Sequence, residues 1–67
     1  MTREEVIKMF RRIYPESEIR IGKITPVDEE HFVLNTYFPD GNFSFVITEN
    51  CVSNSYNSEE DAIRSIR

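Results

Sequence analysis

The chain has 67 residues, of which 39% are hydrophobic and 30% are charged, and its formal net charge at pH 7 is −4. A domain of this size buries only about 60% of the surface that its unfolded chain exposes, which argues against a large internal substrate cavity. The acidic balance disfavours binding to nucleic acid and to anionic lipid. We therefore expect a single domain over residues 1–67 whose binding sites lie on its surface.

The first element that the sequence predicts is a helix over residues 3–14. Thr2 and Glu5 form the Thr-x-x-Glu pattern of a capping box immediately before an apolar run. The apolar positions that follow lie at helical spacing: Val6, Met9, Phe10 and Ile13. Pro15 ends the helix, because the residue before a proline is pushed out of the α region.

A first β-strand is expected before Pro26, where isoleucine recurs at Ile19, Ile21 and Ile24. The parity of these isoleucines changes across Gly22, which predicts a β-bulge at the glycine. Pro26 either ends this strand or confines it to an edge of the sheet. The acidic residues 28–30 then form the connection to the next strand.

The next two strands, over residues 31–38 and 42–48, form a hairpin with Pro39, Asp40 and Gly41 in its turn. Either a three-residue loop with a bulge or a four-residue loop over residues 39–42 connects them. Of the two, the four-residue loop places the large apolar side chains of both strands on one face: Phe32, Leu34, Phe38, Phe43, Phe45 and Ile47. Burying them together, at about 1.5–3 kcal/mol each, outweighs a preference in turn geometry. We therefore expect the four-residue loop.

The end of the chain predicts a short helix. Ser58 is a good N-cap, three acids follow it, and Ala62, Ile63 and Ile66 supply an inward face. The segment 51–57 before it is either a short fourth strand carrying Val52 and Tyr56 or an ordered loop. The predicted fold class is α+β: a small α-β-β-β-(β)-α domain with an antiparallel sheet and both helices packed on one of its faces.

If both helices cover one face of the sheet, the other face is open to solvent or to a partner. In the expected register this open face carries Val33, Asn35, Tyr37 and Val46. Apolar and aromatic residues among small polar ones are typical of a protein-binding surface. Tyr37 is the first candidate for partner contact, since tyrosine is enriched among binding hot spots.

Two acidic clusters are the second candidate for partner contact: Asp28, Glu29 and Glu30 in the turn, and Glu59, Glu60 and Asp61 at the start of the last helix. Their carboxylates could imitate phosphates and occupy the basic groove of a nucleic-acid-handling protein. The ordinary alternatives are a solvated turn and a helix N-terminus whose dipole favours negative charge.

The sequence contains no pattern that predicts catalysis. His31 is the single histidine and Cys51 the single cysteine, and neither has partners at metal-ligand spacing. A glycine-rich phosphate loop and a nucleophile elbow are both lacking. We therefore expect no enzyme activity, no metal and no cofactor. The lone cysteine fits a reducing compartment, and with no signal peptide or membrane-spanning stretch recognised, we expect a cytoplasmic protein.

The α-β-β-β-α order and the length of the chain resemble the double-stranded-RNA-binding domain. That family opens its second helix with a lysine cluster that grips phosphates, whereas this chain has acids there, at Glu59, Glu60 and Asp61. The resemblance leaves a weak nucleic-acid binder that uses Lys8, Arg11 and Arg12 of the first helix. Three hypotheses follow: a protein-binding regulator or inhibitor, which we favour, a homodimeric accessory module, and this nucleic-acid binder.

Overall fold

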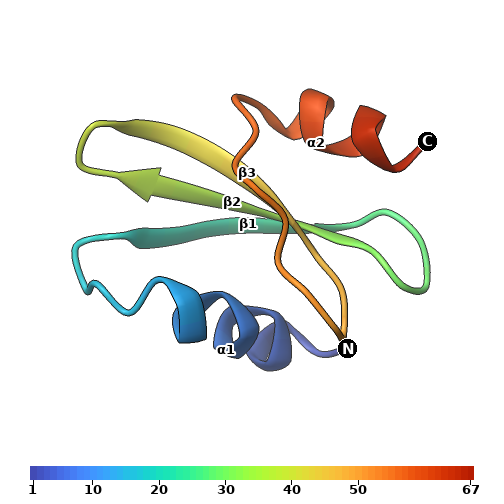
Figure 1. Cartoon of the computed structure of the whole chain (residues 1–67), viewed down its shortest axis with the longest axis horizontal. Coiled ribbons are helices and arrows are strands. Elements are labelled where there is room, and N and C mark those ends of the chain that lie inside the picture. The colour runs from blue at the N-terminus through green and yellow to red at the C-terminus, as the bar shows by residue number, and fades with distance from the viewer.

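The computed structural model describes residues 1–67 and contains two helices and three strands (Figure 1). In chain order they are α1 (Arg3–Ile13), β1 (Arg20–Pro26), β2 (Phe32–Phe38), β3 (Gly41–Ile47) and α2 (Glu59–Ile66). The strands form one antiparallel sheet in the order β1-β2-β3. This arrangement confirms the α+β fold class. Neither helix is long and apolar enough to cross a membrane.

Helix α1 begins at the capping box that the sequence predicts. The Glu5 N–H donates to Thr2 Oγ1 at 3.2 Å, and the Thr2 N–H donates to Glu5 Oε1 at 2.7 Å. The inward face of the helix buries Val6 and Phe10 completely. These two side chains pack on one face of the sheet with Ile19, Leu34, Phe45 and Ile47.

Helix α2 packs on the opposite face of the sheet, so the molecule has three layers (Figure 1). Its buried Ala62 packs against Val33 and Val46, which neighbour Leu34 and Phe45 in sequence and therefore point the other way. The expectation that both helices lie on one face is wrong. The second face of β2 and β3 also carries apolar side chains, Val33 and Val46, and two amphipathic helices can bury both faces only from opposite sides.

The hairpin between β2 and β3 has a two-residue turn. Phe38 pairs with Gly41, which leaves only Pro39 and Asp40 in the turn. Neither the four-residue loop nor the bulged three-residue loop forms, and no residue adopts a positive φ. The pairing differs from the expected one by two residues. Because side chains on a strand alternate with a period of two, the predicted set of core residues still shares one face.

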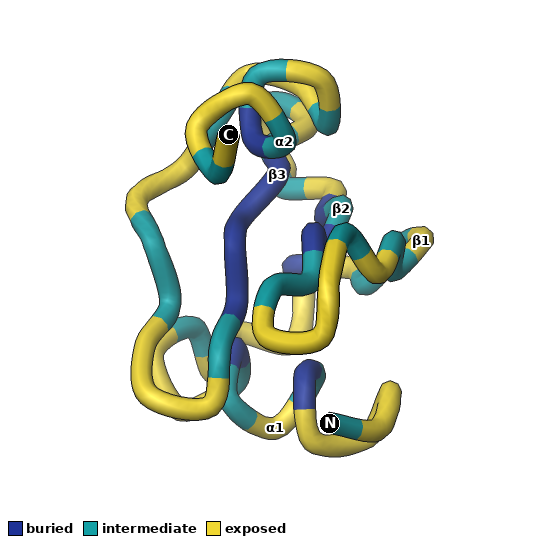
Figure 2. The backbone as a smooth tube through the Cα atoms, turned by 90° about the vertical axis from the view of Figure 1, so that its right-hand side faces the viewer, coloured by how far each residue is buried: buried dark blue, intermediate teal, exposed yellow.

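Strand β1 contains the predicted bulge, because its register with β2 shifts between Ile21 and Ile24. Both isoleucines therefore point to the α1 side of the sheet. In Figure 2, β1 lies at the margin of the molecule and none of its residues is buried. It pairs only with β2, so its other edge is free.

The opposite edge of the sheet, on β3, is covered by the segment 51–56. Ser44 and Tyr56 exchange two backbone hydrogen bonds of 2.8 and 2.7 Å, and the Ser53 N–H donates to the Val46 carbonyl at 2.9 Å. The Val46 N–H donates to Ser53 Oγ at 2.8 Å, so a side chain replaces a backbone acceptor. The segment is thus an ordered loop with two isolated bridges, at Tyr56 and Val52, rather than a continuous fourth strand.

Candidate functional site

The sheet face that we expected to be open is largely covered. Val33 is 0% exposed and Val46 is 8% exposed, because α2 packs over both. The central part of the expected binding face therefore belongs to the hydrophobic core, and the expectation that Val33 and Val46 contact a partner is wrong. Asn35 is partly buried, and Tyr37 keeps 47% of its surface exposed.

Helix α2 leaves one end of this face uncovered, next to the turn between β2 and β3. The cross-strand partners there are Arg20 on β1, Tyr37 on β2 and Asn42 on β3, all exposed. We call these three residues the Tyr37 row. Besides Tyr37, the only large hydrophobic side chain with comparable exposure is Ile13, which is 54% exposed on α1. Sequence reasoning missed Arg20 and Asn42, because only the register places them beside Tyr37.

A polar network lies between the Tyr37 row and the first turn of α2. Asn35 Nδ2 donates to Glu59 Oε1 at 3.0 Å and to the Lys23 carbonyl at 3.1 Å. The Ser44 hydroxyl donates to Asn35 Oδ1 at 2.6 Å, and the Thr25 hydroxyl donates to Glu59 Oε1 at 2.5 Å. Glu59 and Asn35 therefore tie α2 to all three strands, and no buried polar side-chain atom lacks a partner.

The same contacts favour the ionised form of Glu59. The hydrogen bond from Thr25, then the one from Asn35, hold the pKa of Glu59 below its ordinary value of 4.5, and the charge of Lys23 acts in the same direction. Partial burial opposes these effects but is the smaller influence than the two hydrogen bonds. Glu59, which the sequence predicted as an outward docking carboxylate, is thus engaged inside the protein.

An open hollow of about 340 Å³ lies over this network. Its polar lining comes from the strands, the start of α2 and the loop before it, and includes Lys23, Asn35, Tyr37, Asn42, Asn57 and Glu59. The lining offers hydrogen-bond donors and acceptors but no nucleophile paired with a base. The hollow is open to solvent and does not form an enclosed cavity.

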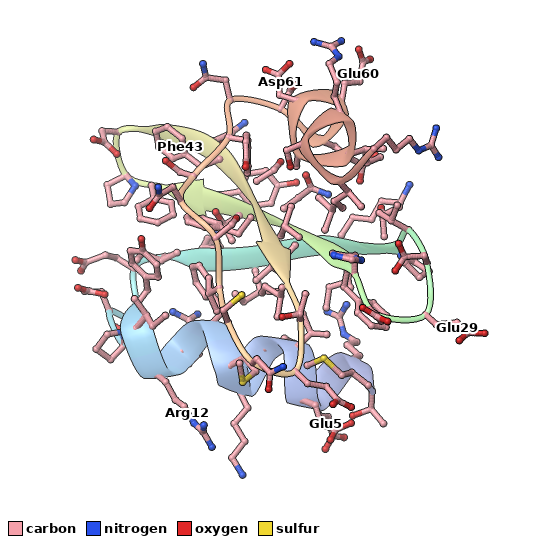
Figure 3. All side chains as sticks on the ribbon, turned by 45° about the vertical axis from the view of Figure 1, so that its right-hand side comes forward. Glu5, Arg12, Glu29, Phe43, Glu60 and Asp61 are labelled. Carbon is pink, nitrogen blue, oxygen red and sulfur yellow. The ribbon has the colours of Figure 1, made fainter.

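The two acidic clusters do not form one surface. In Figure 3, Glu60 and Asp61 project from α2, whereas Glu29 lies at the tip of the connection between β1 and β2. Asp61 also pairs with Arg64, at 3.3 Å. No group of three or more His, Cys, Asp or Glu side chains is placed to hold a metal ion.

Within the acidic cluster of residues 28–30, Asp28 already forms hydrogen bonds to neighbouring residues. Its Oδ1 accepts hydrogen bonds of 2.8 Å from the backbone N–H groups of Glu30 and His31 and lies 2.8 Å from His31 Nδ1. The contact with the His31 side chain is the largest cause that lowers the pKa of Asp28, and the Glu30 N–H adds to it. Glu29 and Glu30 remain exposed.

The basic residues of α1 also differ in whether they contact other parts of the protein. The Arg11 guanidinium donates to the carbonyl oxygens of Tyr14, Glu16 and Ile19 at 3.5, 2.8 and 2.6 Å. It therefore holds the chain that connects α1 to β1. Arg12 and Lys8 are exposed, and Arg12 points away from the sheet (Figure 3). Of the three cations expected to contact nucleic acid, Arg11 is occupied within the protein.

The chain matches no protein-family model, no curated protein sequence and no solved structure at a significant level.

Proposed function

We propose that this protein is a small non-catalytic protein-binding module, a regulator or inhibitor that docks on its partner through the Tyr37 row. The observation that carries the proposal is the position of Tyr37: a half-exposed aromatic ring on a central strand, between Arg20 and Asn42, where α2 leaves the sheet uncovered. Tyrosine and arginine are enriched among the residues that dominate binding energy.

The position of the Tyr37 ring favours this role, because the ring lies against the backbone of Gly22. A side chain that is already held in place loses less conformational entropy when a partner binds. The amide of Asn42 and the guanidinium of Arg20 then supply hydrogen-bond donors at the rim of the contact.

The other docking surfaces have less support from the contacts. A phosphate-mimicking surface on α2 would use Glu59, Glu60 and Asp61. Glu59 is bonded to Thr25 and Asn35 and Asp61 is paired with Arg64, so only Glu60 is exposed and unengaged. The lone cysteine, Cys51, remains the reason to expect this binding in the reducing cytoplasm.

The proposal is tested by Tyr37→Ala with Ile13→Ala as the matched control, since these residues are the two exposed large hydrophobic side chains. A partner is first captured with the wild-type protein, identified and purified, and its affinity for each variant is measured. Loss of a hot-spot side chain weakens binding by about 2 kcal/mol or more, roughly thirtyfold. We expect that loss for Tyr37→Ala and almost none for Ile13→Ala. Unchanged affinity of a folded Tyr37→Ala variant contradicts the proposal.

A further inference from the structure

We propose that the partner segment which binds beside Tyr37 is extended and acidic, and that it adds to the sheet as a strand along the free edge of β1. This inference rests on the proposed function and names the chemistry of the partner. It also predicts how the partner is held: by backbone hydrogen bonds to β1, with side-chain contacts to Tyr37.

The first observation that supports this inference is that one edge of the sheet is covered and the other is free. The segment 51–56 bonds to the edge of β3, while the outer edge of β1 has no pairing partner. In an edge strand, alternate N–H and C=O groups point away from the sheet and remain available for another chain. Residues Arg20–Pro26 form this edge, and Pro26 limits the useful length because it lacks an N–H.

The second support is charge. Strand β1 contains two of the eight basic residues, Arg20 and Lys23, and none of the twelve acidic ones, so it has a charge of +2 while the rest of the chain has −6. Neither residue forms a salt bridge, since the two close contacts between basic and acidic side chains, His31 with Asp28 and Arg64 with Asp61, are elsewhere. Glu59, whose carboxylate shares a hollow with Lys23, has its Oε1 bonded to Thr25 and Asn35. An acidic segment complements this edge.

The same charges argue against a second copy of this chain as the occupant. Antiparallel pairing of two β1 strands about a two-fold axis would bring together four cations, Arg20 and Lys23 from each copy, with no carboxylate in either strand. Like charges placed opposite each other across strands are destabilising. The basic residues therefore select an acidic partner and discourage self-association.

The third support is the reach of Tyr37 towards the free edge. A Cβ on Gly22 would lie 2.7 Å from Tyr37 Cε2 and 3.1 Å from its hydroxyl oxygen, so both the ring and the hydroxyl lie over β1. Gly22 has no side chain to separate the ring from the edge. A side chain of an added strand on this face can therefore contact Tyr37 directly, which joins the edge and the Tyr37 row into one surface.

The experiment uses a displayed library of random twelve-residue peptides, selected against the wild-type protein and against the double variant Arg20→Glu, Lys23→Glu. We expect the wild type to enrich acidic peptides without proline and the double variant to lose them. The best acidic peptide is then synthesised and added to the protein while backbone amide exchange is followed by NMR. Saturating peptide should slow exchange of outward-pointing β1 amides at least tenfold.

The controls separate the alternatives. The same peptide with alternate backbone nitrogens methylated keeps its charge but cannot pair as a strand, so it should neither bind nor protect β1. Absence of enriched acidic peptides, or resonance shifts confined to Lys8 and Arg12 on α1, overturns the inference. If the protein alone forms a dimer in which the β1 amides are protected, a second copy of the chain occupies the edge. That result also overturns the inference.

The outcomes also separate this inference from the proposed function. If binding of the identified partner depends on Tyr37 but the β1 amides stay unprotected, the Tyr37 row is the docking surface and strand addition is wrong. If Tyr37→Ala leaves that binding unchanged while acidic peptides protect β1, the edge binds acidic segments and the proposed function of the Tyr37 row fails.

Discussion

Tyr37 lies over Gly22 on the neighbouring strand, so closely that a Cβ on Gly22 would stand 2.7 Å from Tyr37 Cε2. The glycine is needed for this close approach and not for its backbone angles, since no glycine in the protein has a positive φ. The contact occurs at the bulge of β1, where the register shifts after Ile21. One position thus shapes the edge strand and places the exposed ring.

Gly22→Ala should destabilise the fold, whereas Gly41→Ala should not. The new methyl at position 22 would lie 2.7 Å from Tyr37 Cε2 and 3.1 Å from the Asn35 carbonyl oxygen, so the half-exposed ring must move aside, and we expect the free energy of unfolding to fall by about 1 kcal/mol. At position 41 the nearest atoms, in the Phe43 ring, are 3.5 Å away, which is ordinary contact. Gly41→Ala should therefore raise the free energy of unfolding by about 0.4–1 kcal/mol, because alanine has fewer conformations than glycine in the unfolded chain. Urea unfolding measures both, and equal effects would contradict the placement of Tyr37.

Arg11→Ala should be much more destabilising than Arg12→Ala. Arg11 donates hydrogen bonds to three carbonyl oxygens between Tyr14 and Ile19, and Arg12 makes none. Hydrogen bonds from a charged donor contribute about 1.5–3 kcal/mol, while surface substitutions away from such contacts stay within about 0.5 kcal/mol. Thermal or urea unfolding of the two variants gives the comparison. Similar losses would show that the connection between α1 and β1 does not depend on the Arg11 guanidinium.

Much of the fold follows from local patterns in the sequence. The capping box at Thr2, the N-cap at Ser58 and the bulge near Gly22 all appear where the residues predict them. The helix expected over 3–14 runs from Arg3 to Ile13. Each of these features depends on residues close together in the chain, whose spacing is visible without knowledge of the tertiary contacts.

The two errors in the predicted fold concern how elements pair and pack against one another. Burial of Phe45 with Leu34 is satisfied by any register that differs by two residues, so the apolar pattern could not distinguish a two-residue turn from a four-residue loop. The side on which α2 packs depends on the path of residues 48–58. A signal was nevertheless present, because Val33 and Val46 make the second face apolar and a second helix was available to cover it.

The contribution of Glu59 to stability should depend on pH. Its pKa in the folded protein is below its ordinary value of 4.5, so the ionised form stabilises the fold fully above that value. As the pH falls from 4.5 through the folded pKa, this stabilisation is lost. We therefore expect the difference in free energy of unfolding between wild type and Glu59→Gln to shrink over that acid range.

The control for this titration is Glu60→Gln, which removes a carboxylate from the same turn without touching Thr25 or Asn35. The comparison matters because Glu5 and Asp28 also have lowered pKa values and destabilise every variant together in acid. Urea unfolding over an acid-to-neutral pH series isolates the Glu59 effect as the difference between the two variants. If the difference in free energy of unfolding between wild type and Glu59→Gln stays constant with pH, the hydrogen bonds from Thr25 and Asn35 do not stabilise the ionised form of Glu59.

Val33→Ala tests the three-layer arrangement directly. Val33 is 0% exposed because α2 covers it, and Val6, on the inward face of α1, is also 0% exposed. Full burial of a valine side chain contributes about 1.5–3 kcal/mol, so truncation to alanine should lower the free energy of unfolding by a substantial part of that at both positions. On an open sheet face the same change would stay within about 0.5 kcal/mol. Urea unfolding of Val33→Ala and of Val6→Ala therefore tests whether α2 buries this face. Comparable losses of unfolding free energy support the three layers. A loss for Val6→Ala alone would show that Val33 is exposed to solvent.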